Sequence, residues 1–249
     1  MNRWLRYVPL VLTTLLVFGL LRLARTDLRY LFPLALVVFA VLAPPWLLRR
    51  RTRRLLQSGD VRRVLGAWQI TFERVAHPET MAPLLAATAY AAYGWLEAAH
   101  TALARSAKGP VWDAAIEQRL FVETLLDSFE GERERAVAKA EALCALPYPS
   151  SAGFFVRRRV TLLRQGLSAL ARAFARKATP KDLSTLRRAG LSSPLVHWPM
   201  RYAQAIVAVD AGDRDHARAL LEGAPQWPEE SAFKAFDSEL RERVEAAGA

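Results

Sequence analysis

Residues 202–212 read Tyr-Ala-Gln-Ala-Ile-Val-Ala-Val-Asp-Ala-Gly, and this stretch shows the pattern that decides the fold of most of the chain. Its apolar residues recur at helical spacing, and Gly212 can take the left-handed conformation that ends a helix. Asp213 and Asp215 then open the next helix, where acidic side chains suit its positive end. Ala217 is small enough to let the two helices approach closely. The stretch therefore predicts two helices joined by a tight turn.

The same arrangement recurs along the chain. A glycine after an apolar helical segment, with a small or apolar residue five positions later, occurs as Gly59 with Val64, Gly94 with Ala99, Gly131 with Ala136, Gly166 with Ala171 and Gly212 with Ala217. The glycines are 35, 37, 35 and 46 residues apart. This period is typical of a solenoid of stacked helical hairpins, so we predict an all-α fold. The alternative is an irregular all-α bundle with fortuitous glycine spacing.

With these motifs, most of residues 58–230 resembles the tetratricopeptide-repeat family, a protein-binding solenoid of roughly 34-residue units. Residues 202–228 match best, and residues 84–110 and 120–147 match less well. No unit carries the complete Trp-x2-Leu-Gly-x2-Tyr first helix of the family, so the side chains that face the groove are not fixed. The resemblance implies a protein-binding repeat domain over residues 55–249. Apolar residues at helical spacing in the tail predict a capping helix at about 231–245.

Residues 1–54 have a different character. Two apolar runs, at about 5–22 and 30–48, are candidates to cross a bilayer, which takes roughly 20 residues. The uncharged part of the first run, residues 7–21, is short for this, but Arg6 and Arg22 at its ends can snorkel and complete the span. A basic segment follows, with Arg49, Arg50, Arg51, Arg53 and Arg54 placed for a membrane interface. We therefore predict a transmembrane helical hairpin that contacts lipid and anchors the repeat domain. A signal peptide is the alternative for the first run, although no small-x-small cleavage site follows it.

The arginines also predict the orientation of the hairpin. Seven arginines lie between residues 49 and 63, against three in the connector at residues 22–29. Lys and Arg are enriched in cytoplasmic loops. We therefore predict an integral protein of the cytoplasmic membrane, with its C-terminal domain in the cytosol.

The net charge of +11 is unevenly distributed, because residues 1–54 carry +9 and the remainder only +2. The basicity therefore does not indicate a nucleic-acid partner. A second basic segment, residues 151–200, has ten Lys and Arg against one acid, Asp182. Its candidate binding residues are Arg157, Arg158, Arg159, Arg164, Arg172 and Arg176. They could bind an acidic protein segment or anionic lipid, or form an ordinary solvated basic face.

Motifs that carry catalytic chemistry are missing from the sequence. It contains no Gly-x4-Gly-Lys-Ser/Thr phosphate loop, no Gly-x-Ser-x-Gly elbow and no His-Glu-x2-His zinc motif. The four histidines are isolated in sequence, and the single cysteine, Cys144, excludes an intrachain disulfide. We therefore expect no enzyme activity, metal, cofactor, small-molecule substrate or nucleic-acid partner.

Together these features predict a membrane-anchored helical-repeat scaffold or adaptor that binds a protein partner at the cytosolic face. The alternative is a structural or assembly subunit of a multi-protein membrane complex, in which the two spans pack against other membrane helices.

Overall fold

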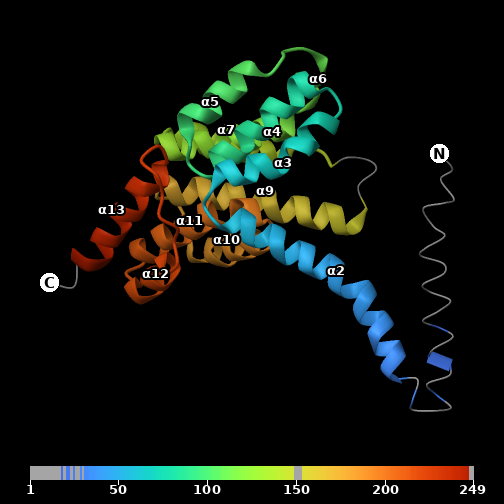
Figure 1. Ribbon diagram of the computed structural model, residues 1–249. Helices are drawn as coiled ribbons and strands as arrows, with labels where there is room; N and C mark the ends of the chain where they lie inside the picture. Colours follow the sequence, from blue (N-terminus) through green and yellow to red (C-terminus); the bar gives the residue numbers. More distant parts are fainter. Residues whose placement is uncertain are drawn as a thin grey trace. The chain divides into compact units, whose positions relative to one another are not determined.

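The computed structural model describes residues 18, 21–22, 25, 29, 31–148 and 153–246, without the side chains of residues 36–38 and 40–45. The chain divides into two compact units, residues 1–54 and 55–249. Helices are the regular structure of the described residues, and no strand occurs among them (Figure 1). The all-α part of the prediction is confirmed for this part of the chain.

The helices, with their bounds, are α2 (Leu31–Gln57), α3 (Val61–Arg74), α4 (Pro78–Ala92), α5 (Leu96–Arg105), α6 (Pro110–Ala114), α7 (Ile116–Glu130), α8 (Arg133–Ala145), α9 (Phe154–Phe174), α10 (Pro180–Ser192), the 3-10 helix η3 (Pro194–Val196), α11 (His197–Asp210), α12 (Arg214–Leu221) and α13 (Ala232–Ala246).

The predicted transmembrane hairpin is corrected by the structure. Across the described residues, no helix combines the length and the apolar character needed to cross a membrane. The first predicted span, 5–22, lies outside the described residues except for positions 18, 21 and 22. The predicted localisation as an integral membrane protein with a cytosolic C-terminal domain depended on these spans, and it is corrected with them.

The second predicted span, 30–48, differs from α2 in where the helix ends. Proline usually ends or kinks a helix, so the sequence indicated an end near Pro44 and Pro45. Instead, α2 continues through the arginine-rich residues, which are good helix formers, as far as Gln57. The apolar residues and the five arginines therefore share one helix, whose last turn places Leu56 in the core of the second unit.

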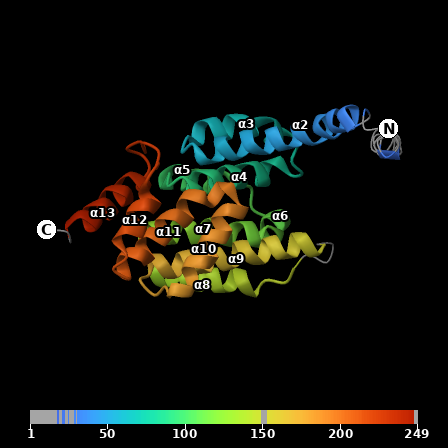
Figure 2. The same cartoon turned by 90° about the horizontal axis from the view of Figure 1, so that it is seen from below.

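Residues 55–249 form a row of helical hairpins. The pairs α4–α5, α7–α8, α9–α10 and α11–α12 each pack closely, and the first helix of each pair contacts the first helix of the next. The second helix of each pair also contacts the hairpin that follows, and α13 packs on α11 and α12. Figure 2 shows these helices lying side by side in the second unit. Each hairpin thereby covers an apolar face of its neighbour.

The turns that join paired helices contain a residue with positive φ, between 58° and 85°. In the four hairpins these residues are Gly94, Gly131, Arg176 and Gly212, and Gly59 takes the same conformation between α2 and α3. Along the chain, the five are 35, 37, 45 and 36 residues apart. The irregular step therefore lies one hairpin earlier than the glycines suggested, because α9 has 21 residues whereas α4 and α7 each have 15.

Gly166 does not mark a hairpin turn, because it lies inside α9. A Cβ at this position would be 2.4 Å from the Cβ of Ala189 in α10. The glycine is required there for a close crossing of two helices. Arg176 instead takes the left-handed conformation after α9, with a φ of 58°. The hairpin is the same, but a different residue makes its turn.

The C-terminal segment folds back onto the first hairpin. Ala232 donates its backbone N–H to the carbonyl of Gly94 at 2.8 Å, and the Ser231 hydroxyl donates to the carbonyl of Tyr93 at 2.7 Å. Phe233 and Phe236 of α13 also pack against Phe129 of α7. Part of the face formed by the first helices is therefore occupied by the chain itself.

Candidate functional site: the basic segment, the polar cluster and the apolar groove

The six candidate arginines of the basic segment divide into two groups in the structure. Arg164 belongs to the inner group and is buried. Its Nε donates to Glu117 Oε1 at 3.0 Å, and its Nη1 donates to the carbonyl oxygen of Leu146 at 2.6 Å. These bonds tie α9 to α7 and to the end of α8. Arg164 is therefore a structural residue and is not available to a partner.

Arg172 and Arg176 are also engaged within the domain. The Arg172 guanidinium donates to both carboxylate oxygens of Asp182 and to the Ser168 hydroxyl. Burial works against the charge of Asp182, but the hydrogen bonds from Arg172 and Thr179 outweigh it and hold the pKa of this carboxyl below its ordinary value of 3.8. Arg176 pairs with Asp210 of α11. Both arginines join neighbouring helices.

Arg157, Arg158 and Arg159 form the outer group, on the first two turns of α9. All residues from Gly153 to Arg159 are exposed, and we call them the aromatic-basic tip. Phe154 is 72% exposed and Phe155 is 82% exposed, and their rings meet edge to face with centroids 5.6 Å apart. The tip is thus a helix end that combines cations with uncovered aromatic rings.

Sequence reasoning identified the arginines of the tip but missed Phe154 and Phe155. A signal was present, since three apolar residues directly precede the arginine run. The surrounding sequence also lacks any acidic residue between Glu141 and Asp182.

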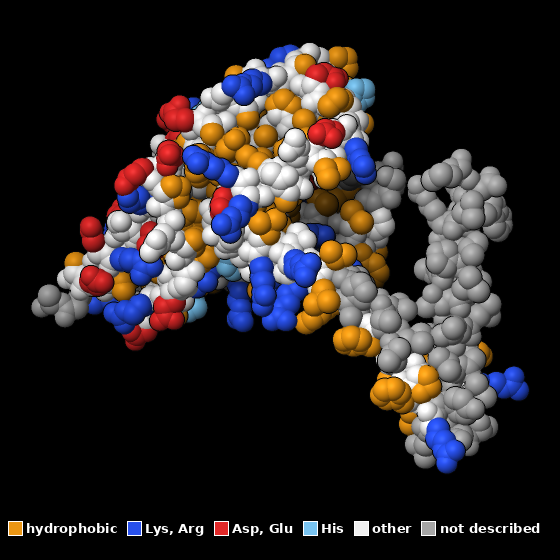
Figure 3. Space-filling view, viewed as in Figure 1, with side chains coloured by type: hydrophobic (Ala, Val, Ile, Leu, Met, Phe, Trp, Pro, Cys, Tyr) orange, Lys and Arg blue, Asp and Glu red, His pale blue; other side chains and the backbone are white. Residues whose placement is uncertain are grey.

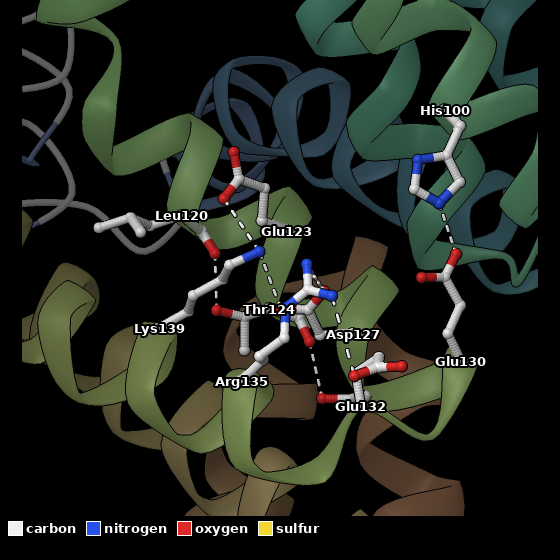
Figure 4. Close-up of polar contacts among 10 residues, drawn as sticks. His100, Leu120, Glu123, Thr124, Asp127, Glu130, Glu132, Arg135 and Lys139 are labelled. Carbon is white, nitrogen blue, oxygen red and sulfur yellow. Dashed lines mark hydrogen bonds and ion pairs between the residues drawn. The ribbon is translucent and has the colours of Figure 1, made fainter.

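A polar cluster built around a buried carboxylate lies between α7 and α8 (Figure 4). The buried carboxylate of Asp127 lies 2.8 Å from Nζ of Lys139 and 3.4 Å from Nη2 of Arg135. Thr124 and Ser128 donate their hydroxyls to carbonyls of their own helix. The carboxylate of Asp127 is thus paired with two cationic side chains, and the two hydroxyls donate to backbone carbonyls and not to a basic side chain. The cluster therefore joins the two helices and does not resemble a catalytic centre.

An apolar groove of about 650 Å³ lies over α3, α4 and α5. Its lining includes small side chains of α4 and α5 and three larger ones. The small ones are Ala82, Ala86, Ala98 and Ala102, and the larger ones are Phe72, Tyr90 and Arg105. Figure 3 shows hydrophobic side chains gathered on the face over α4 and α5. The groove has the small-residue surface that lets a helix approach closely.

The structure also shows where the remaining predicted residues lie. Arg49, Arg50, Arg51, Arg53 and Arg54 are exposed on α2. The alanines of the repeat pairs, Ala99, Ala136, Ala171 and Ala217, are fully buried. Within the described ranges, no group of three or more His, Cys, Asp or Glu side chains is placed to hold a metal ion.

Comparison with known proteins gives no relative on which to base a function. No protein-family model, no curated protein and no solved structure matches the chain. The groove and the aromatic-basic tip are therefore the features of this structure that bear on function.

Proposed function

We propose that residues 55–249 act as a tetratricopeptide-like helical-repeat adaptor that binds a helical segment of a protein partner. The observation that carries the proposal is the row of four hairpins, each packed on the next through its first helix. Rows of this kind use their extended surfaces to bind other proteins. A membrane-anchored scaffold and a complex subunit whose spans pack in a membrane would both require the spans that the structure corrects, so neither is proposed.

The groove over α3, α4 and α5 is the surface that we assign to the partner. Part of the face made by the first helices is filled by Trp227, Phe233 and Phe236 of the chain itself. The centroids of their rings lie 5.1 to 6.4 Å from those of Phe129 in α7 and Tyr202 in α11. The groove, in contrast, leaves Ala86 and Ala98 only half-buried. Small side chains on two adjacent helices suit the apolar stripe of an amphipathic helix.

A photo-crosslinking amino acid at Thr101, an exposed residue of the groove, tests the proposal. The protein captured there is identified and purified, and its affinity for the full chain is measured by isothermal titration calorimetry. We expect Ala98→Glu to weaken binding about tenfold or more, because a charged side chain would lie in the apolar contact.

Ala104→Glu is the matched control, because Ala104 is an exposed residue of the same helix and is not part of the groove lining. We expect it to leave the affinity unchanged, and both variants should retain the helical circular-dichroism spectrum. Equal affinities for the two variants would refute the assignment of the groove. So would equal capture from crosslinkers at Thr101 and Ala104.

A further inference from the structure

We infer that the aromatic-basic tip, residues 153–159, binds an anionic lipid surface, with Phe154 and Phe155 in the interfacial layer and Arg158 and Arg159 on lipid phosphates. This contact lies at the lipid surface and needs no helix that crosses a bilayer. It is also independent of the proposed groove, because no residue of the tip takes part in the groove over α3, α4 and α5.

The shape of the tip is the first support for the inference. α9 has 21 residues, whereas its neighbours α8 and α10 have 13 each. Its first two turns extend past these neighbours, as Figure 2 shows. Every residue from Gly153 to Arg159 is exposed, so these turns are accessible to another molecule. The extension also accounts for most of the irregular step in the hairpin spacing, so it is an addition to the repeat.

The exposed aromatic rings are the second support. Phe154, Phe155 and Val156 are 72%, 82% and 55% exposed. Inside a helical-repeat domain, apolar side chains of this size are normally the residues that stack one hairpin on another. Here they lie at the start of a helix, where their burial would require something outside the domain. Aromatic rings at the boundary between water and acyl chains find such an environment.

The charge of the tip identifies the kind of surface. Arg158 and Arg159 lie four residues after Phe154 and Phe155, and within the described part of the chain neither forms an ion pair with an acidic side chain. The inner arginines, such as Arg164 and Arg172, are held by Glu117 and Asp182 instead. Unpaired cations beside exposed rings complement the phosphates of anionic headgroups. The positive end of α9 adds to this attraction.

A lipid surface suits this tip better than an acidic protein segment does. A rigid partner would contact one side of a two-turn helix end and would bury little area. A fluid interface can surround the end, so that rings and guanidinium groups on different sides are all accommodated. The tip is a projection and has no groove of its own in which a peptide could lie.

The test places an environment-sensitive fluorophore on the tip of the full chain. Cys144 is exposed, so it is first replaced by Cys144→Ser, and Val156→Cys then carries the label. Vesicles of phosphatidylcholine alone are compared with vesicles that contain about 30% phosphatidylglycerol. We expect a blue shift of the emission, and quenching by brominated lipid, with the anionic vesicles only. Higher salt should weaken the response.

Two further variants of the chain test whether the response is specific to the tip. A label at Ala104→Cys, on the exposed side of α5, reports general adsorption and should not respond. Reversal of charge in Arg158→Glu with Arg159→Glu should reduce partitioning of the tip label about tenfold or more, while the melting temperature stays the same.

Three results would overturn the inference. One is an equal response to neutral and anionic vesicles, and another is an equal response from the labels at 156 and 104. The third is protection of the tip label by an acidic protein with no response to vesicles, which would assign the tip to a protein partner. Each leaves the crosslinking test of the groove unaffected, so the two proposals fail separately.

Discussion

The two parts of α9 make an instructive comparison, because similar residues serve opposite purposes in them. The first two turns, Phe154–Arg159, are wholly exposed, although three of their six residues are apolar. The later turns bury Arg164 together with Leu167 and Leu170. In one part the aromatic rings face outward, and in the other a guanidinium group lies in the interior.

The difference shows that the residue type alone does not tell whether an arginine stabilises the fold or is available to bind another molecule. An arginine whose donors all meet acceptors of its own domain contributes to folding, and its loss leaves those acceptors unsatisfied. An exposed arginine contributes little to folding but keeps its donors for another molecule. Substitutions in the later turns should therefore change stability, and substitutions in the tip should change binding.

The largest effect is expected for Arg164→Met. The substitution keeps much of the side-chain volume but leaves the Glu117 carboxylate and the Leu146 carbonyl without their donor. We expect a loss of about 3 kcal/mol in the free energy of unfolding, measured by urea denaturation. Arg158→Met is the control and should change it by less than about 0.5 kcal/mol. Equal losses in the two variants would remove the distinction between the parts of α9.

A second test uses the close crossing of α9 and α10. Gly166→Ala would place a Cβ 2.4 Å from the Cβ of Ala189, so the helices must separate. We expect destabilisation by about 2 kcal/mol. Gly66→Ala in α3 meets no atom within 4 Å and should instead stabilise by about 0.5–1 kcal/mol through helix propensity. The melting temperatures of the two variants should therefore change in opposite directions. A change in the same direction would contradict the requirement for glycine where α9 and α10 cross.

The third test concerns the pH dependence of the pair between Arg172 and Asp182. Because the pKa of Asp182 is lowered in the folded protein, its contribution to stability is complete above the ordinary value of 3.8 and is lost as the pH falls through the folded value. We expect Asp182→Asn to cost about 1–2 kcal/mol at neutral pH, since Arg172 is about a third exposed and solvent screens the pair.

Urea midpoints measured from pH 7 down to pH 3 check this dependence. The gap between Asp182→Asn and the unsubstituted protein should stay constant above the ordinary value of 3.8 and narrow progressively below it, as the folded carboxyl takes up a proton. A gap of the same size at pH 7 and at pH 3 would mean that the shape of the side chain matters and its charge does not.

Much of the helical pattern could be predicted from the sequence, and the failures have physical causes. Gly94, Gly131 and Gly212 lie in hairpin turns because a left-handed residue after a helix is most easily glycine. Gly166 was wrongly predicted to mark a turn, because glycine is also found inside helices where two of them cross closely. Arg176 could not be predicted as the residue of the turn, since no sequence pattern distinguishes an arginine that takes the left-handed conformation.

The end of α2 and the candidate surfaces depended on information that the sequence does not contain. Prolines at 44 and 45 suggested a helix end, but the arginines beyond them continue the same helix to Gln57. Apolar residues such as Phe154 and Phe155 would ordinarily be assigned to a core, and only the length of α9 beyond its neighbours leaves them exposed. The groove likewise depends on which faces of α4 and α5 meet.

The smallest effect on stability is expected for Phe155→Ser, and it bears most directly on the comparison. Phe155 is 82% exposed, so losing its ring should change the free energy of unfolding by less than about 0.5 kcal/mol in urea denaturation. Partitioning of the labelled tip onto anionic vesicles should nevertheless fall, because the ring would no longer enter the interfacial layer. A core phenylalanine such as Phe233, which is fully buried, should behave in the opposite way, with Phe233→Ala costing about 3–5 kcal/mol. If Phe155→Ser destabilised the domain comparably, the tip would pack on the protein and the contrast within α9 would not hold.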